Sequence, residues 1–139
     1  MTQQALTTGA LALACAAALW GAPKVQIADP LADLPFGRVE APSEDARLLR
    51  TFEARGWAAD DQGIEEVRVF VDRRYVTSVE REAAPRHLIE EHPGTSVTGW
   101  SGKVTVPPDL PPGEHLLVVQ VVDREGLARV IGVVPIVID

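Results

Sequence analysis

The sequence predicts an all-β protein, an Ig-like antiparallel β-sandwich of about seven strands preceded by an N-terminal hydrophobic helix. Short stretches from residue 36 onward alternate apolar and polar residues, as half-buried strands do. Turns rich in Asp, Gly or Pro separate these stretches at regular spacing. Valine is favoured over aromatic residues, and no long helical stripe is present, which disfavours an α/β fold.

Two strands joined by an Asp/Gly turn form the clearest part of the pattern. Residues 48–58 alternate in polarity, and the turn at residues 60–63 contains the residue types that tight turns favour. The second strand has valines at alternate positions. The side chains expected to face the core are Phe52, Ala54, Gly56 and Ala58 before the turn and Val67, Val69 and Val71 after it.

The neighbouring segments follow in order. Residues 36–40 form a short first strand that Pro42 ends. Residues 75–79 pair back on the second strand as a hairpin. Residues 80–94 are the one irregular region, with about two helical turns over residues 86–92 between two prolines.

The last part of the chain completes the sandwich. Residues 97–106 are extended, and Gly99 and Gly102 mark bulges or places of close backbone approach. The proline-rich segment 107–113 is an exposed connection, because prolines cannot occupy a central strand. The final strands are residues 114–123, with Leu117, Val119 and Val121 on one apolar face, and residues 127–138.

The N-terminal segment has a different composition. Residues 1–23 contain no charged side chain, and residues 5–22 are rich in Ala and Leu, which predicts a signal peptide or a membrane anchor. Cleavage after residues 14–16, retention as a membrane span, and lipidation of Cys15 in a degenerate lipoprotein box are three alternatives. In each of them residues 24–35 form a linker, and the domain of residues 36–139 is exported to the periplasm or cell surface.

The overall composition excludes some functions. The chain has 139 residues, enough for one domain, and a net charge of −7 without a basic cluster, which argues against nucleic-acid binding. A single cysteine excludes an intrachain disulfide and a thiolate zinc site.

Trp57 and Trp100 are the candidate ligand-binding residues. Two exposed tryptophans on one sheet face would form a stacking platform for sugar rings. The alternative is that each fills the core or covers the end of a sheet beside a glycine.

Asp60, Asp61 and Asp123 are the candidate metal ligands, since carboxylates in turns can gather calcium together with backbone carbonyls. The alternative is that they hydrogen-bond turn amides. Calcium needs six to eight oxygen ligands, which is more than one turn offers. A calcium ion at these turns is therefore the less favoured interpretation, and we expect no other cofactor.

The histidines and serines do not form a catalytic motif. His87 and His92 are five residues apart, so on a helix they diverge and do not form a zinc pair. His115 follows the proline-rich segment, where a surface position is expected. The segment Gly99–Gly102 lacks the full Gly-x-Ser-x-Gly nucleophile motif, so we expect no enzyme.

Several segments resemble an Ig-like module of bacterial exported and cell-surface proteins. They are Gly37–Pro42, Gly56–Asp60, Gly63–Ile64 with Val67–Asp72, Pro85–Arg86, His92–Pro93, Gly99–Gly102 and Leu110–His115. The resemblance covers residues 36–139. It departs at Arg73, where a turn glycine is usual, and at His92, which replaces an aromatic residue. It implies a sandwich that accompanies membrane-bound or secreted enzymes and surface proteins.

These observations together predict a non-catalytic binding or spacer module at the bacterial cell envelope, membrane-tethered through residues 5–22. Its expected partner is an envelope protein or polysaccharide, and its oligomeric state is open. Two alternatives remain. One is a carbohydrate-binding module that uses exposed tryptophan, and the other is the C-terminal accessory domain of a membrane-bound envelope enzyme.

Overall fold

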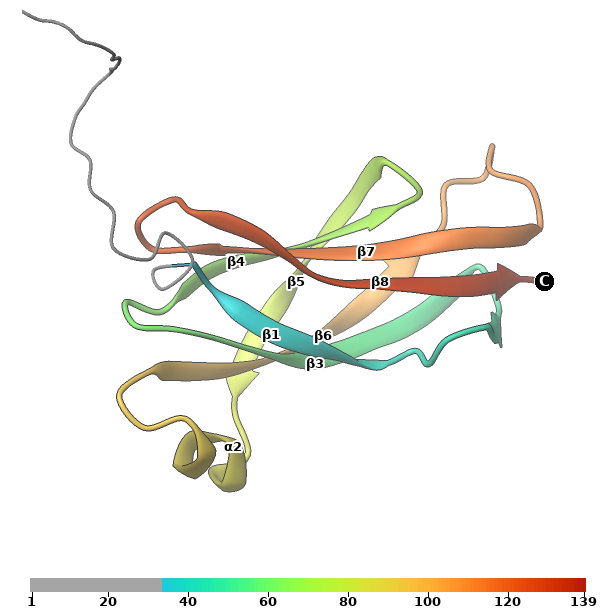
Figure 1. Ribbon diagram of the computed structural model, residues 1–139. Helices are drawn as coiled ribbons and strands as arrows, with labels where there is room; N and C mark the ends of the chain where they lie inside the picture. The colour runs from blue at the N-terminus through green and yellow to red at the C-terminus, as the bar shows by residue number, and fades with distance from the viewer. Residues whose placement is uncertain (1–33) are drawn as a thin grey trace, which may run out of the picture. The chain divides into compact units, whose positions relative to one another are not determined.

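Two β-layers that share one strand make up residues 34–139, the part of the chain that the computed structural model describes (Figure 1). The expectations for the N-terminal helix, for Cys15 and for the start of the linker lie outside the described residues. Within the described residues, no helix is long and apolar enough to cross a membrane.

The strands and the short helix follow one another closely along the chain. They are β1 (Phe36–Ala41), β2 (Ala46–Leu48), β3 (Thr51–Asp60), β4 (Ile64–Val71), β5 (Arg74–Ala83), α2 (Arg86–Glu91), β6 (Ser96–Thr105), β7 (Gly113–Asp123) and β8 (Ala128–Ile138).

One layer contains β1, β3 and β6, and the other contains β4, β7, β8 and β2 (Figure 1). Strand β5 belongs to both layers, because Arg74–Val79 pair with β4 and Glu80–Ala83 pair with β6. The sheet therefore curls into a sandwich whose eight strands pair antiparallel, except that β2 runs parallel to β8. The predicted antiparallel sandwich is confirmed.

The differences from the predicted elements have physical reasons. The short strand β2 has only three residues, too few to show alternation, and its pairing partner Ile136–Ile138 lies far away in the sequence. The segment expected to be irregular begins as a continuation of β5, because residues 80–83 find a new partner in β6. The helical turns after Pro85 are present as α2.

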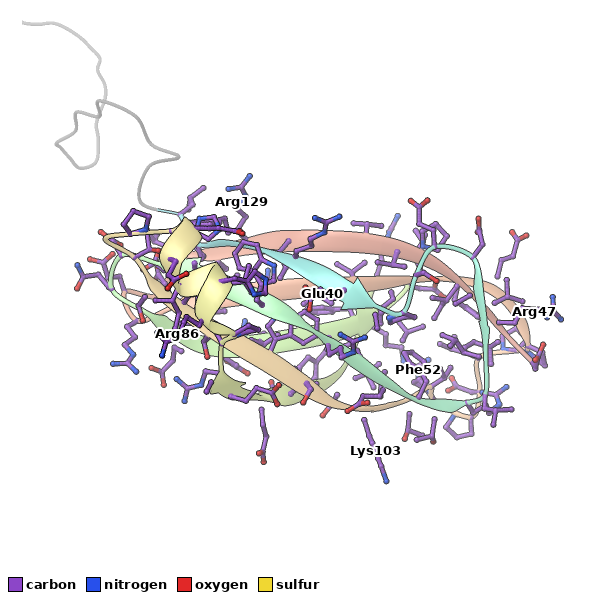
Figure 2. The ribbon with its side chains drawn as sticks, turned by 90° about the horizontal axis from the view of Figure 1, so that it is seen from below. Glu40, Arg47, Phe52, Arg86, Lys103 and Arg129 are labelled. Atoms are coloured by element: carbon purple, nitrogen blue, oxygen red, sulfur yellow. The ribbon has the colours of Figure 1, made fainter. Side chains whose placement is uncertain are left out.

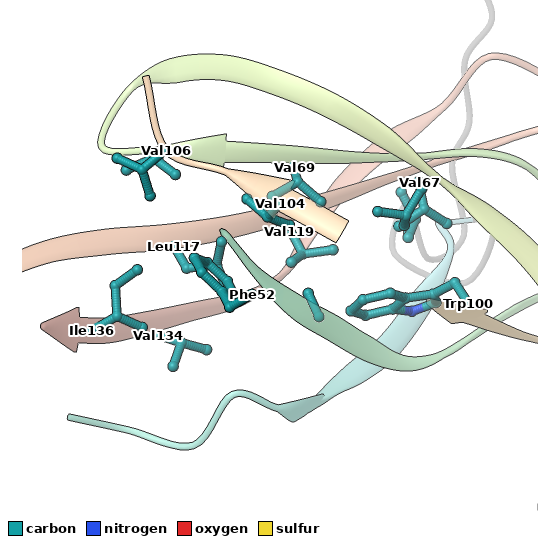
Figure 3. Packing of buried hydrophobic residues seen from close by; sticks show 14 of the residues in the cluster. Phe52, Val67, Val69, Trp100, Val104, Val106, Leu117, Val119, Val134 and Ile136 are labelled. Atoms are coloured by element: carbon teal, nitrogen blue, oxygen red, sulfur yellow. The ribbon is translucent and has the colours of Figure 1, made fainter. Parts of the chain in front are cut away.

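The core lies between the layers and consists mainly of the alternating residues that the sequence indicated (Figure 3). Trp100 is its largest fully buried side chain. The members include Phe52, Ala54, Ala58, Val67, Val69, Val71, Val104, Leu117, Val119 and Val121.

Gly56 makes room for Trp100. The two residues are register partners on β3 and β6. A Cβ atom at position 56 would collide with the carbonyl oxygen of Arg38 and lie 2.6 Å from Cζ2 of Trp100. Gly102 plays a similar part against Val79, whose Cγ1 would lie 2.7 Å from an added Cβ. The pairing of β3 with β6 runs without a register shift, so these glycines mark close approach and not bulges.

We predict that Gly56→Ala lowers the free energy of unfolding by about 1–3 kcal/mol, because the added methyl group overpacks the indole. The measurement is urea unfolding followed by tryptophan fluorescence. The control is Arg55→Ala, which removes the neighbouring exposed side chain on the outer side of β3 and should change the stability by less than about 0.5 kcal/mol. Equal stability of Gly56→Ala and the wild type would contradict the packing described here.

Candidate functional site

The two outer faces of the sandwich differ in polarity. The layer of β1, β3 and β6 presents charged and polar side chains in cross-strand rows. One row contains Arg55, Ser101 and Glu80, and the next contains Glu53 and Lys103. Lys103 points away from the molecule in the view of this layer (Figure 2). A face of this kind is suited to contact with water.

The outer face of β4, β7 and β8, with the adjoining half of β5, is apolar. Its central row crosses four strands, from Tyr75 through Phe70 and Val118 to Val133. Tyr75 is 54% exposed and Val133 is 53% exposed, so both side chains contact solvent. Phe70 contacts Tyr75 edge to face at a centroid distance of 5.8 Å.

The rows on either side extend this surface. Leu116 pairs with Pro135 on one side, and Gln120 pairs with Val130 on the other. Leu116 is 44% exposed and Val130 is 46% exposed. We call the combined surface the apolar face; it consists of Phe70, Tyr75, Leu116, Val118, Val130, Val133 and Pro135. Contiguous exposed apolar area of this kind marks an interaction site on a soluble protein.

Sequence reasoning assigned only the inward residues of these strands and missed the apolar face. The signal was present in residues 116–122 and 130–138, which are apolar on both sides of the strand. Near-continuous apolar runs are typical of strands that are covered on both faces.

Trp57 and Trp100 do not form a shared platform. They lie on neighbouring strands, but Trp57 is the register partner of Gly99 and Trp100 that of Gly56, so their side chains lie on opposite faces of the sheet. Trp100 is 0% exposed and belongs to the core, and its Nε1 has no hydrogen-bond partner among the described residues. Within this structure Trp100 is therefore not accessible to a ligand.

Trp57 lies half-buried in an aromatic cluster on the outer side of β3. The His92 ring packs over its indole at a centroid distance of 5.1 Å and a tilt of 34°. Phe36 meets the indole edge-on at 5.9 Å and the imidazole at 5.4 Å. Part of the Trp57 surface is covered by His92, which leaves less room for a stacked sugar.

Asp60 and Asp123 end strands in different layers, and each is 1% exposed. The Gln62 N–H donates to Oδ2 of Asp60 at 2.9 Å. The N–H groups of Glu125 and Leu127 donate to Oδ1 of Asp123 at 2.9 and 2.8 Å. These are the turn hydrogen bonds that the sequence suggested as the alternative to metal binding.

The electrostatics of this pair of turns are unfavourable for two ionised carboxylates. Burial raises the pKa of Asp60, and the nearby charges of Asp123 and Asp61 raise it further, although the Gln62 N–H acts in the opposite direction. Oδ2 of Asp123 is buried and has no hydrogen-bond partner among the described residues. No group of three or more His, Cys, Asp or Glu in residues 34–139 could hold a metal ion. Calcium at Asp60, Asp61 and Asp123 therefore stays a prediction for experiment.

His115 is buried and only 8% exposed, whereas the sequence analysis predicted a surface position. Its Nε2 hydrogen-bonds the Pro111 carbonyl oxygen at 2.6 Å and its Nδ1 lies 2.8 Å from Oδ2 of Asp72. Both ring nitrogens donate when the imidazole is charged. The Pro111 carbonyl and then Asp72 raise the pKa of His115. Its partner is 43 residues away in the sequence, so no local pattern indicates the burial.

Asp72 holds this site together from the turn between β4 and β5. Burial acts to raise the pKa of Asp72, but donation from the Leu116 N–H and from His115 outweighs it and lowers the pKa. The Leu116 N–H lies 3.0 Å from Oδ1 of Asp72. The segment that begins at Pro111 is thereby fastened to β4.

Ser78 is the hydroxyl with the most direct carboxylate contact, and it is unsuited to nucleophilic catalysis. Its Oγ donates to Oε2 of Glu66 at 2.6 Å. Arg68 binds Glu66 at 3.0 Å and, with Ser78, lowers the pKa of that carboxyl. A carboxylate held ionised in this way is a poor general base at neutral pH.

Comparisons with known proteins found likenesses to solved structures only. No protein-family model matches the chain, and no curated protein matches it. A solved structure of Clostridium thermocellum CbhA fibronectin(III)-like modules is similar over 76% of this chain and 45% of that chain, with 19% sequence identity and a TM-score of 0.49. The chain thus spans less than half of that chain, and the sandwich described here rests on its own strand pairing.

We predict that the free energy of unfolding falls as the pH rises through the folded pKa of His115. The pKa of His115 is higher in the folded than in the unfolded state, so the charged imidazole stabilises the fold. This stabilisation is fully present below about pH 6.5, the pKa of an unfolded histidine, and is lost above the folded pKa. Urea unfolding at a series of pH values from 6 upward measures this fall.

The matched variants are His115→Gln and Asp72→Asn. His115→Gln should flatten the fall, because the titrating group is gone. Asp72→Asn should reduce the fall in stability, because the negative charge beside the imidazole is removed. The backbone at this position has a φ of 59°, which Asn tolerates. An unchanged pH profile in His115→Gln would exclude this site as its source.

We predict that Asp60→Asn stabilises the protein at pH 7 by about 1 kcal/mol, because the amide removes a buried charge beside Asp123 and keeps an acceptor for Gln62. The raised folded pKa of Asp60 means that its ionised form is a cost at neutral pH and that the gain should shrink as the acid protonates. Thermal unfolding of Asp60→Asn and of the control Glu53→Gln, which neutralises an exposed carboxylate on the outer side of β3, measures the difference.

The same experiment tests calcium. We expect millimolar calcium to leave the wild-type Tm unchanged, since too few oxygens converge on these turns. A calcium-dependent rise in the wild-type Tm that Asp60→Asn abolishes would establish a bound cation and contradict this expectation.

Proposed function

We propose that this chain is a non-catalytic, exported binding or spacer module at the bacterial cell envelope. The observation that carries the proposal is the apolar face on an otherwise charged sandwich. A spacer without a partner gains nothing from exposed Tyr75, Leu116 and Val133, which cost solubility. A module that docks through this layer gains a hydrophobic contact.

The described residues also favour binding over catalysis. The polar clusters around His115, Asp123 and Glu66 are held in hydrogen bonds that fasten turns and strands. Each has a structural explanation that needs no substrate. A sandwich positions loops and faces for binding, and function on such a fold depends on its sites.

Export is supported by the composition of the first residues. Residues 1–23 lack charged side chains, and residues 5–22 are rich in Ala and Leu, as signal peptides and membrane anchors are. Within this proposal, residues 5–22 are a signal peptide or an anchor, and Cys15 is the lipid attachment site if the segment is a lipoprotein signal. Attachment to a larger membrane enzyme is compatible with the same arrangement.

A polysaccharide ligand is the second candidate, and half-buried Trp57 is the observation that favours it. An aromatic ring beside His92 and Phe36 could stack on a sugar with its exposed part. Binding of purified envelope polysaccharide that Trp57→Ala abolishes, while the variant stays folded, would establish this candidate.

We predict that the full chain, produced in a bacterial host, is found in the periplasmic or membrane fraction and is digested by protease added to cells with a permeable or removed outer layer. Intact-mass measurement then separates the three alternatives: a chain shortened by about 16–22 residues, a full-length membrane species, or a lipid-sized addition on a chain that begins at Cys15. A full-length chain in the cytoplasm, protected from protease, would overturn the proposed location.

A further inference from the structure

We propose that a polysaccharide without anionic groups binds along β5, with one sugar ring stacked on Tyr75 and the next units in the hollow where β5 passes from one layer to the other. This inference deepens the proposed function, because it names a class of ligand for the edge of the layer that carries the apolar face. The carrying observations are the fixed Tyr75 ring, the polar row beside it and the hollow that continues this row.

The Tyr75 ring is exposed and held at both ends. The side chain is 54% exposed. The Phe70 ring packs against it edge to face, at a centroid distance of 5.8 Å and an interplanar angle of 73°. The Tyr75 hydroxyl group lies 2.9 Å from Oγ of Ser78, within hydrogen-bond distance. A tyrosine has an apolar ring and a polar tip, which match the C–H face and the hydroxyl edge of a pyranose. Because the ring is held in advance, less conformational freedom is lost when a sugar stacks on it.

Polar side chains form a row beside the aromatic residues. Ser78, Arg68 and Gln120 are register partners across β5, β4 and β7. Oγ of Ser78 donates to Oε2 of Glu66 at 2.6 Å, and the Arg68 guanidinium lies 3.0 Å from Oε1 of the same carboxylate. A guanidinium and a carboxylate have more donor or acceptor positions than these bonds use. Sugar hydroxyl groups both donate and accept, so they match a row in which donors and acceptors lie side by side.

A hollow of about 590 Å³ continues from this polar row. It lies where β5 leaves β4 and joins β6, beside Ile64, whose carbonyl oxygen accepts from Nη1 of Arg81 at 2.7 Å. Its lining includes Glu66, Ser78, Glu80, Arg81, Glu82 and Thr98. Glu66 and Ser78 belong to both the row and the hollow, and the volume lies within the range of roughly 300–1,000 Å³ that is typical of ligand sites. We call the Tyr75 ring, the polar row and the hollow together the Tyr75 site.

The charge of the hollow selects against anionic ligands. Glu65, Glu66, Glu80 and Glu82 line it, and among its described lining residues only Arg81 is basic. The whole chain has a net charge of −7. A polymer of uronic acids or phosphodiesters would be repelled here, whereas an uncharged polysaccharide meets no such barrier. Its hydroxyl groups can donate to the carboxylate oxygens, and such hydrogen bonds to charged acceptors are strong.

Tyr75 fits a stacked sugar better than Trp57 does. Trp57 is half-buried, and the His92 ring packs over its indole at 5.1 Å. An apolar partner surface laid over the Tyr75 end of the layer would bury the Arg68–Glu66 pair without new hydrogen bonds, which is costly. Sugar hydroxyl groups avoid this cost because they can hydrogen-bond both members of the pair.

The test is isothermal titration calorimetry of the full chain, in a detergent without a sugar headgroup, with hexamers of β-linked glucose, β-linked N-acetylglucosamine and galacturonic acid. We expect at least one uncharged hexamer to bind and the galacturonic acid hexamer not to bind. Tyr75→Thr should weaken the binding by at least about 10-fold, because the stacking surface is lost. Tyr75→Phe keeps the ring and should bind within about 3-fold of the wild type. Threonine suits an exposed strand position, so circular dichroism of Tyr75→Thr should match that of the wild type.

The matched control is Trp57→Ala, which removes an aromatic ring from the other layer and should bind like the wild type. The proposal would be overturned if neither uncharged hexamer bound at millimolar concentration, if the galacturonic acid hexamer bound as tightly as they do, or if Tyr75→Thr bound like the wild type. Binding that Trp57→Ala abolishes and Tyr75→Thr leaves unchanged would also exclude the Tyr75 site, and would establish the second candidate of the proposed function instead. A chain that binds none of these sugars, but is exported and docks on an envelope protein, would contradict only this inference and leave the proposed function in place.

Discussion

The burial of Trp100 between the two layers is the contact on which the rest of the sandwich depends. The indole faces the backbone of β3 at Gly56, and the close fit sets the spacing of β3 and β6 against the opposite layer. Valines from β4 and β7 then complete the core around it. Trp57, one residue after Gly56 on β3, points to the opposite side of the same sheet and lies outside this core.

The outer faces of the two layers differ in polarity. The outward residues of Thr51–Arg55 in β3 and of Ser101–Thr105 in β6 are charged or polar, as Arg55 and Lys103 are, and Trp57 lies on the same side further along β3. Strands β7 and β8 place apolar residues on both faces, which is the pattern of a strand covered on both sides. A single copy covers only one side. The described residues therefore leave the outer side of this layer exposed as an apolar surface.

Local patterns were sufficient for most of the fold and for little of the site. Alternation placed Val67, Val69 and Val71 in the core, and the Asp/Gly turn lay where it was expected. The strand β2 and the second half of β5 form by pairing with strands that are distant in the sequence, so no local pattern predicts them. The same reason explains His115, whose burial depends on Asp72, and the tryptophans, whose faces follow from the pairing register of β3 with β6.

Buried polar groups lie at both ends of β4, and they respond to pH in the same direction. At one end Asp72 and His115 form a hydrogen-bonded pair that is strongest when the imidazole is charged. At the other end Asp123 pairs in register with Ile64, and the raised pKa of Asp60 makes a second negative charge there unfavourable. Loss of a proton at either end therefore weakens the fold. Asp72, with its lowered pKa, acts in the opposite sense only in stronger acid. The folded state is therefore most favoured at a pH below the folded pKa of His115 and above the folded pKa of Asp72, where the imidazole and the carboxylate of this pair are both charged.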